Sequence, residues 1–339
     1  MEPNGNIWLF IFNIMLEILY MNNEMMLPQS QNAANHKSIT LNVPGIFLFS
    51  DLLYKLLDIV FDKTGYRIPI KYMYGAPQLR WNNGRLILNK YNNDFSMRGI
   101  EKELYTSVEK EIIPLLTFSN VYIDSFDLKD KKCNQVLEIL DEIGGGVIIS
   151  SSVLKDYIME KYSNIKIHSS VIMTAFEDNR TSAYYQQLSS KYEKYVIHPD
   201  DNFDLELLKT VPKNNAEIIV NERCKINCKI RKEHYQAISK EQIAQAENRY
   251  IDGKFLDSCD MIPEIKQQKS MFRNISLTNE EISNLTNMGF DLFKLQGRTD
   301  NLYVFFFDLL RYTLDNDVVF PNIFPIFSYY IEKYIKEQK

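Results

Sequence analysis

Two cysteines four residues apart, Cys224 and Cys228, lie in the segment NERCKINCKIRKEHY. If the chain turns helical directly after a strand here, both thiols share one helix face and could bind one metal centre. Cys259 follows in the same region, and Cys133 opens an earlier predicted helix. Four thiolates suit an iron-sulfur cluster of the 4Fe-4S type, with zinc as the alternative. The competing interpretation is four buried apolar cysteines, because free cysteine is among the most buried residue types.

The residues that flank these thiols could supply acid-base chemistry. His234 and Tyr235 could donate protons or orient a substrate, and His234 could act as the base for a cysteine nucleophile. Glu222 and Asn221 end the preceding predicted strand and are expected to point toward a ligand. The alternatives are a structural histidine and a strand-end cap.

Positive charge is concentrated around the thiols of an otherwise acidic chain. The basic residues of the segment are Lys225, Lys229, Arg231 and Lys232. Such a cluster lowers thiol pKa values and attracts an anionic ligand. The alternative interpretation is that these charges lie on a solvent-exposed helix face, which is more common for a run of charged residues. Lys294 and Arg298, at a later predicted strand end, could bind carboxylate or phosphate. Arg231 also stands where a radical-SAM motif would have its third cysteine, which disfavours that assignment.

Eight short apolar runs, which alternate with helical patterns, must position these groups. The predicted strands span 38–45, 68–75, 113–120, 145–152, 165–173, 194–201, 216–224 and 291–298. Each run begins apolar and ends in polar or small residues, as the packed interior and the C-terminal mouth of a barrel require. We therefore expect an α/β fold, a (β/α)8 TIM-like barrel with an insertion between strands 7 and 8. An open doubly wound sheet is disfavoured because no glycine-rich turn follows the first strand.

The polar strand ends add further candidate ligands. Asn120 and Ser169 are expected to bind substrate at the barrel mouth. His198 and Asp200 could hold a metal, but Pro-Asp-Asp before a helix is more typical of N-capping. An Asn-Gly pair at 83–84 predicts a small hairpin, within 78–96, over the mouth.

A single barrel domain is predicted over 38–339, with an embedded cysteine-bearing insertion at 223–287 and a C-terminal helix. Residues 1–37 are expected to be a poorly ordered or non-native extension. The apolar run at 7–20 contains Glu17 and is shorter than the ~20 residues that span a bilayer, so we do not expect a membrane anchor.

The composition narrows the class of partner. The chain has 339 residues, a net charge of −5 and a sequence pI near 5.6, which argues against coating nucleic acid or an anionic membrane. Four cysteines without the usual secretory signal fit the reducing cytoplasm. The expected partners are an anionic small-molecule substrate or a modified biomolecule, and a protein partner in a larger assembly.

The segment Asn221 to Tyr235 carries the string NE-x-C-x-x-x-C-x-x-R-x-x-H-Y, which resembles the barrel domain of the collagenase-like peptidase superfamily (peptidase U-32-like). The resemblance is to an uncharacterised bacterial branch. It extends to Cys259, MGFDLFKLQGR at 288–298, TFSN at 117–120, GGVIISSSVLKDYI at 145–158 and IHSS at 167–170.

This resemblance implies a TIM-like barrel and, from relatives in the superfamily, a 4Fe-4S cluster that supports oxygen-independent hydroxylation. It implies ligation by Cys224, Cys228 and Cys259, with Cys133 as the weaker fourth candidate. The chain lacks the glycine- and serine-rich cysteine motif of the better-known members, which leaves the substrate open. The leading hypothesis is an iron-sulfur barrel enzyme that acts on an anionic substrate. The alternatives are a collagenase-like peptidase and a non-catalytic accessory or binding barrel.

Overall fold

The structure is a computed structural model that describes residues 39–83, 94–222, 224, 226–249, 276–297, 302–314 and 319–338. Within these ranges, strands and helices alternate from the first strand to the last. The predicted hairpin turn at 83–84 extends beyond the described residues. Residues 1–37, Cys259 and Arg298 lie entirely outside them.

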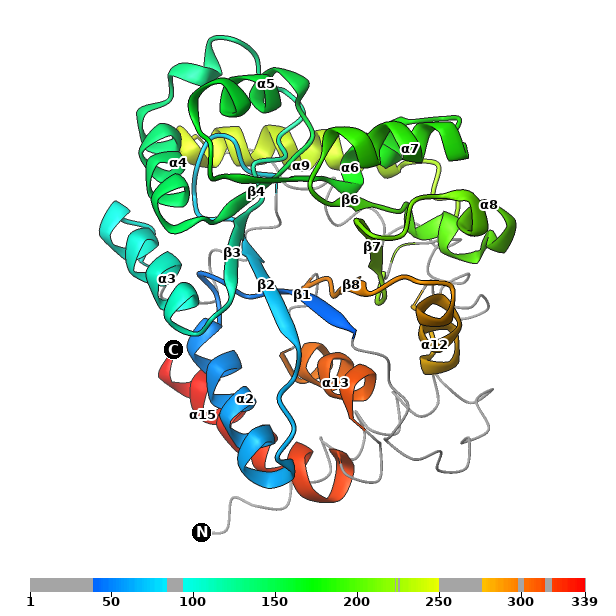
Figure 1. The fold of residues 1–339 in the computed structure, drawn as a ribbon. Coiled ribbons are helices and arrows are strands. Elements are labelled where there is room, and N and C mark those ends of the chain that lie inside the picture. The colour runs from blue at the N-terminus through cyan, green and yellow to red at the C-terminus, as the bar shows by residue number, and fades with distance from the viewer. Residues whose placement is uncertain are drawn as a thin grey trace.

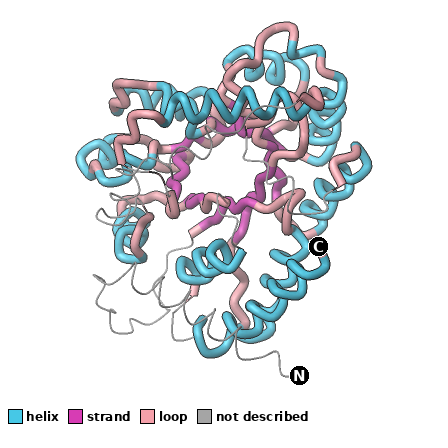
Figure 2. Tube along the Cα trace, turned by 180° about the vertical axis from the view of Figure 1, so that it is seen from behind, coloured by secondary structure: helices cyan, strands magenta, loops and turns pink. Residues whose placement is uncertain are grey.

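Eight parallel strands form one ring, which Figure 2 shows surrounded by helices. They are β1 (Thr40–Pro44), β2 (Ile70–Gly75), β3 (Ile113–Leu116), β4 (Gly146–Ile149), β5 (Lys166–Ser169), β6 (Tyr195–Val196), β7 (Ala216–Ile219) and β8 (Leu292–Lys294). Their order is β5-β4-β3-β2-β1-β8-β7-β6. A parallel bridge between His168 and Lys194 joins β5 to the start of β6, where the Ser169 amide donates to the Lys194 carbonyl at 2.8 Å. The chain therefore folds as a (β/α)8 barrel, as its sequence predicts.

The helices cover the outside of the ring (Figure 1). They are α2 (Ser50–Thr64), α3 (Met97–Glu109), α4 (Lys131–Ile143), α5 (Ser152–Lys161), α6 (Val171–Phe176), α7 (Ser182–Lys191), α8 (Leu205–Thr210), α9 (Arg231–Ala246), α12 (Asn279–Asn287), α13 (Leu302–Thr313) and α15 (Phe324–Glu337). Short 3-10 helices span Asp127–Lys129 and Pro199–Phe203, and a π-helical turn spans Val319–Ile323. The predicted C-terminal helix is confirmed by α15. The described part of the region between β7 and β8 contains α9 and α12.

Local sequence signals explain where individual helices begin and end. The Asp130 carboxylate accepts from the backbone N of Cys133 at 2.9 Å and so caps α4, which ends where Gly144 takes a φ of 66°. Thr278 and Glu281 form a reciprocal capping box at the start of α12. Cys133 thereby faces the interior from the first turn of α4 and is fully buried.

The described residues form three separate apolar clusters, of which the two largest stabilise the barrel. The larger one fills the space between strands and helices and includes the Cys133 side chain. The smaller one, inside the ring, has four fully buried members: Tyr72, Leu115, Ile148 and Leu292. The remaining interior positions include buried polar side chains, among them His168, Glu217 and Lys294. No helix in the described ranges combines the length and hydropathy needed to span a bilayer.

Candidate active site

Helix α9 crosses the C-terminal end of the barrel and joins loops from opposite strands. Near its start, Arg231 binds residues that follow β6, and near its end Gln245 accepts a hydrogen bond at 3.0 Å from Gln78, which follows β2. Between these points the Asn120 amide, which follows β3, donates to the Ser239 carbonyl at 2.9 Å. Figure 1 shows α9 (yellow) running along the α4, α6 and α7 side of the barrel. The helix therefore forms part of the wall of the mouth.

The two thiols lie in the irregular segment before α9, which corrects one step of the sequence argument. No helix begins directly after β7 in the described residues, because α9 starts only at Arg231 and the described residues between are bends, turns or irregular backbone. Asn227 takes a φ of 53°, which a continuing right-handed helix does not allow. Cys224 and Cys228 are therefore not neighbours on a helix face. Both side chains are partly exposed at the mouth.

The start of this cysteine loop, residues 221–230, is fixed by buried hydrogen bonds. Glu222 accepts from the Cys224 backbone N at 3.0 Å and from the Gln296 amide at 2.9 Å. Asn221 accepts from the Gln296 backbone N at 2.6 Å and donates to Asp308 at 3.1 Å. Both Glu222 and Asn221 are at most 1% exposed. They hold the strand ends of β7 and β8 together beneath Cys224.

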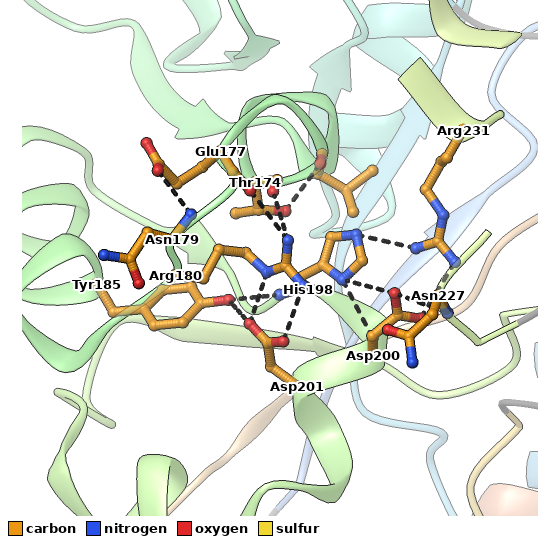
Figure 3. A network of polar contacts seen from close by, with 11 residues as sticks. Thr174, Glu177, Asn179, Arg180, Tyr185, His198, Asp200, Asp201, Asn227 and Arg231 are labelled. Atoms are coloured by element: carbon orange, nitrogen blue, oxygen red, sulfur yellow. Dashed lines mark hydrogen bonds and ion pairs between the residues drawn. The ribbon is translucent and has the colours of Figure 1, made fainter. Parts of the chain in front are cut away.

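The end of the loop is fixed by an arginine, a histidine and an aspartate (Figure 3). Arg231 contacts His198 Nε2 through Nη1 at 2.9 Å and donates from Nη2 to Asp200 Oδ1 at 3.2 Å. Asp200 Oδ2 in turn accepts from the Asn227 backbone N at 3.2 Å. Arg231 is 5% exposed, so its guanidinium interacts with partners inside the protein and not with solvent. The predicted anion-binding arginine is thus the anchor between α9 and the β6 loop.

Each ring nitrogen of His198 faces a donor. Arg231 Nη1 lies 2.9 Å from Nε2, and the Asp200 backbone N donates to Nδ1 at 3.2 Å, so the two donors compete for the one acceptor nitrogen of a neutral ring. Burial first and the Arg231 charge second lower the pKa of His198 to about 2, so the ring is neutral. Burial raises the pKa of Asp200 more than Arg231 lowers it.

A second arginine supports the same β6 loop. Arg180 makes a bidentate ion pair with Asp201, at 2.8 and 3.1 Å, and Tyr185 donates its hydroxyl to the same carboxylate (Figure 3). The 3-10 helix at Pro199–Phe203 confirms that a helical turn begins at Pro-Asp-Asp. Its cap is His198, whose Nδ1 accepts from the Asp200 backbone N, whereas the carboxylates of Asp200 and Asp201 pair with arginines. Sequence reasoning missed this link between residues 198–201 and Arg231, although their polar strand-end position was visible.

The remaining predicted site residues are distributed over several environments. Asn120 also donates to the Asn82 carbonyl at 3.0 Å, and the Ser169 hydroxyl accepts from the Val196 backbone N at 3.1 Å. Lys294 is buried inside the ring, 3.0 Å from Glu217. The structure therefore gives each of these three an internal partner.

The other predicted residues lie along the loop and α9. Lys229 is exposed beside Cys228, and His234 is partly buried in the first turn of α9. Tyr235 is 4% exposed and packs against Ile172 and Ala175. Of the predicted catalytic residues, His234 and Tyr235 thus lie in the first turn of α9, whereas Glu222 lies at the end of β7 beside Gln296.

The described donors fit a thiolate centre in part. Cys224 and Cys228 lie on one loop at the mouth, but Cys133 is fully buried in the apolar core, and its burial raises the pKa of its thiol well above the usual range. Among the described residues, no group of three or more His, Cys, Asp or Glu side chains is placed to hold a metal ion. Two of the four predicted ligands thus suit a metal or cluster, Cys133 does not, and Cys259 lies outside the described residues.

Comparisons with known proteins add little to this geometry. No family model matches the chain, and no curated protein does. Among solved structures, the U32 peptidase Mk0906 is similar, with a TM-score of 0.48 and 12% sequence identity over 80% of this chain and 98% of that chain. We draw no conclusion about activity from this likeness.

Proposed function

We propose that the protein is a barrel enzyme whose centre is a metal or iron-sulfur group bound by Cys224 and Cys228 at the C-terminal mouth. The observation that carries the proposal is the placement of two partly exposed thiols on one loop that is anchored at both ends. Anchoring limits the loop entropy lost when a metal binds. Cys259 is the third proposed ligand, from its place in the sequence.

The charges around the loop support thiolate chemistry. Burial on its own lowers the pKa of Arg231, but Tyr235, Asp200, Glu222 and Cys224 together raise it. The Cys224 thiolate and the Arg231 guanidinium therefore stabilise each other, and a thiolate is the form that binds metals. Arg231 can do this without contacting substrate, because His198 and Asp200 already hold it in place.

The proposed substrate is an anionic molecule that approaches the mouth beside the exposed Lys229. The bound group would supply redox or Lewis-acid chemistry. His234 is the proposed proton donor or acceptor, because Glu222 is committed to the Cys224 backbone and Gln296. Tyr235 has its ring in an apolar contact, and its hydroxyl is proposed to orient the substrate.

The proposal is tested by anaerobic purification followed by iron, sulfide and zinc analysis of single cysteine variants. We expect Cys224→Ala and Cys228→Ala to lose at least half of the metal, whereas Cys133→Ala retains it. Cys133→Ala is the matched control because it removes a thiol of the same chain from the core instead of the mouth. Equal metal content in all three variants would contradict the proposal.

The two alternatives predict different results in the same preparation. A peptidase would cleave peptides without bound metal, and its activity would survive Cys224→Ser but not His234→Ala. An accessory barrel would co-purify with a stable partner and show no turnover. Either result in a metal-free protein would replace the thiolate proposal.

A further inference from the structure

The interior of the ring contains an unusual histidine. His168 projects from β5, is 1% exposed, and its ring packs edge-on against Tyr72 with the centroids 4.9 Å apart. Within the described residues, neither ring nitrogen has a hydrogen-bond partner. A buried polar group without a partner costs about 1–3 kcal/mol, and here two nitrogens are affected. Such a group calls for a binding partner from outside the chain.

The register of the strands places His168 one inward-facing position below the mouth. It pairs with Ile148 on β4, and two residues later, just past the end of β5, Ser170 caps α6. On β8, Lys294 occupies the corresponding level, two residues before Gln296, which binds Glu222. A ligand group bound beside His168 would therefore lie directly below the mouth, between β5 and β8.

The surrounding charges are already balanced. Lys294 pairs with Glu217 at 3.0 Å, and Asn42 donates to the other oxygen of Glu217 at 2.6 Å. The Asn42 side-chain oxygen has no hydrogen-bond partner among the described residues. Burial first, and the Lys294 charge next, lower the pKa of His168 well below its usual value, so its ring is neutral. A charged ligand would find no free counter-charge here and would have to lose its water of hydration.

A neutral imidazole offers one N–H donor and one acceptor nitrogen. The matching ligand is a small uncharged group that both accepts and donates, such as a primary amide or a hydroxyl. We propose that the barrel interior beside His168 binds an uncharged amide or hydroxyl group of a substrate that enters from the C-terminal mouth, with the Asn42–Glu217–Lys294 cluster as a neutral wall. The proposed binding position contains none of the cysteine-loop residues, so a test of this proposal does not depend on the outcome of the metal proposal.

The inference is tested by ¹⁵N NMR of the ring nitrogens in the full chain with ¹⁵N-labelled histidine. Acetamide is the probe, and acetate, its anionic isostere, is the control ligand. We expect a saturable shift of the His168 ring nitrogens with acetamide and none with acetate. Ile148→Leu, which alters the neighbouring strand without removing a polar atom, should retain the response.

His168→Phe identifies the resonance and should fold, because it replaces unpartnered polar atoms by apolar ones. If it does not fold, His36→Gln, His198→Gln and His234→Gln assign His168 by elimination, since the chain has four histidines. Ring nitrogens that do not respond to acetamide would mean that ordered water alone occupies the position, which overturns the inference. An equal response to acetate would overturn its restriction to uncharged groups.

Discussion

The buried ion pair between Glu217 and Lys294 allows a quantitative prediction about the barrel interior. The two residues are 1% and 7% exposed and lie on the neighbouring strands β7 and β8. Glu217→Gln removes the negative charge while keeping the shape and the contact with Asn42. It leaves the Lys294 ammonium without its partner in a region that excludes water. The double variant Glu217→Leu with Lys294→Met removes both charges.

Breaking one side of a buried pair costs about 3–5 kcal/mol, because the remaining ion is desolvated without compensation. Replacing both partners by apolar residues is expected to be near neutral or stabilising by about 1–4 kcal/mol. With an unfolding entropy of roughly 2.1 cal/mol/K per residue, a loss of about 4 kcal/mol lowers Tm of this chain by about 6 °C. The double variant should therefore melt several degrees above either single variant.

The assay is urea unfolding of wild type, Glu217→Gln, Lys294→Met and the double variant, with calorimetry for Tm. The coupling energy between the two sites should exceed about 2 kcal/mol. Single variants that each cost less than about 1 kcal/mol, with additive effects in the double variant, would refute the description of this pair as buried and mutually dependent.

Further predictions concern the mouth and the core. Burial beside Arg231 holds the folded-state pKa of His198 near 2, so as the pH falls below 6.5 this histidine is protonated in the unfolded chain but not in the folded chain. The free energy of unfolding should therefore fall by up to about 2.7 kcal/mol from pH 6.5 to 4.5. Urea unfolding should show a shallower fall in His198→Gln, and an unchanged slope would argue against a neutral ring. Iodoacetamide should modify Cys224 but leave Cys133 unmodified in the native chain; mass spectrometry that finds equal labelling would contradict the burial of Cys133. Asn120→Ala removes two buried hydrogen bonds and should cost about 2 kcal/mol, with faster hydrogen exchange in the middle of α9 and unchanged exchange in α2.

The fold was largely predictable because each strand is a short apolar run that ends in polar residues. All eight predicted ranges contain a strand, but several extend too far at the C-terminal end. The range 165–173 is an example, since β5 ends at Ser169 and Val171 already begins α6. The apolar residues 171–173, two of them β-branched, look like strand, yet the Ser170 hydroxyl accepts from the Ile172 backbone N and starts a helix.

The place of the cysteine string in the fold was predictable, but its contacts were not. The described residues from Asn221 to Tyr235 follow the C-terminal end of β7, as strand-end polarity indicates. The helical spacing assumed for the two thiols was wrong, because turns precede α9. The pairing of Arg231 with His198 and Asp200 joins residues about thirty positions apart. Local periodicity carries no information about such a long-range contact.

The central claim is that Cys224 and Cys228 bind a metal at the C-terminal mouth. X-ray absorption at the edge of the metal retained by the anaerobically purified chain tests it most directly. The account predicts sulfur scatterers at about 2.3 Å. It also predicts that their number falls in Cys224→Ser and in Cys228→Ser, but not in Cys133→Ser. A first shell made only of nitrogen and oxygen, or one that is unchanged in all three variants, would contradict it.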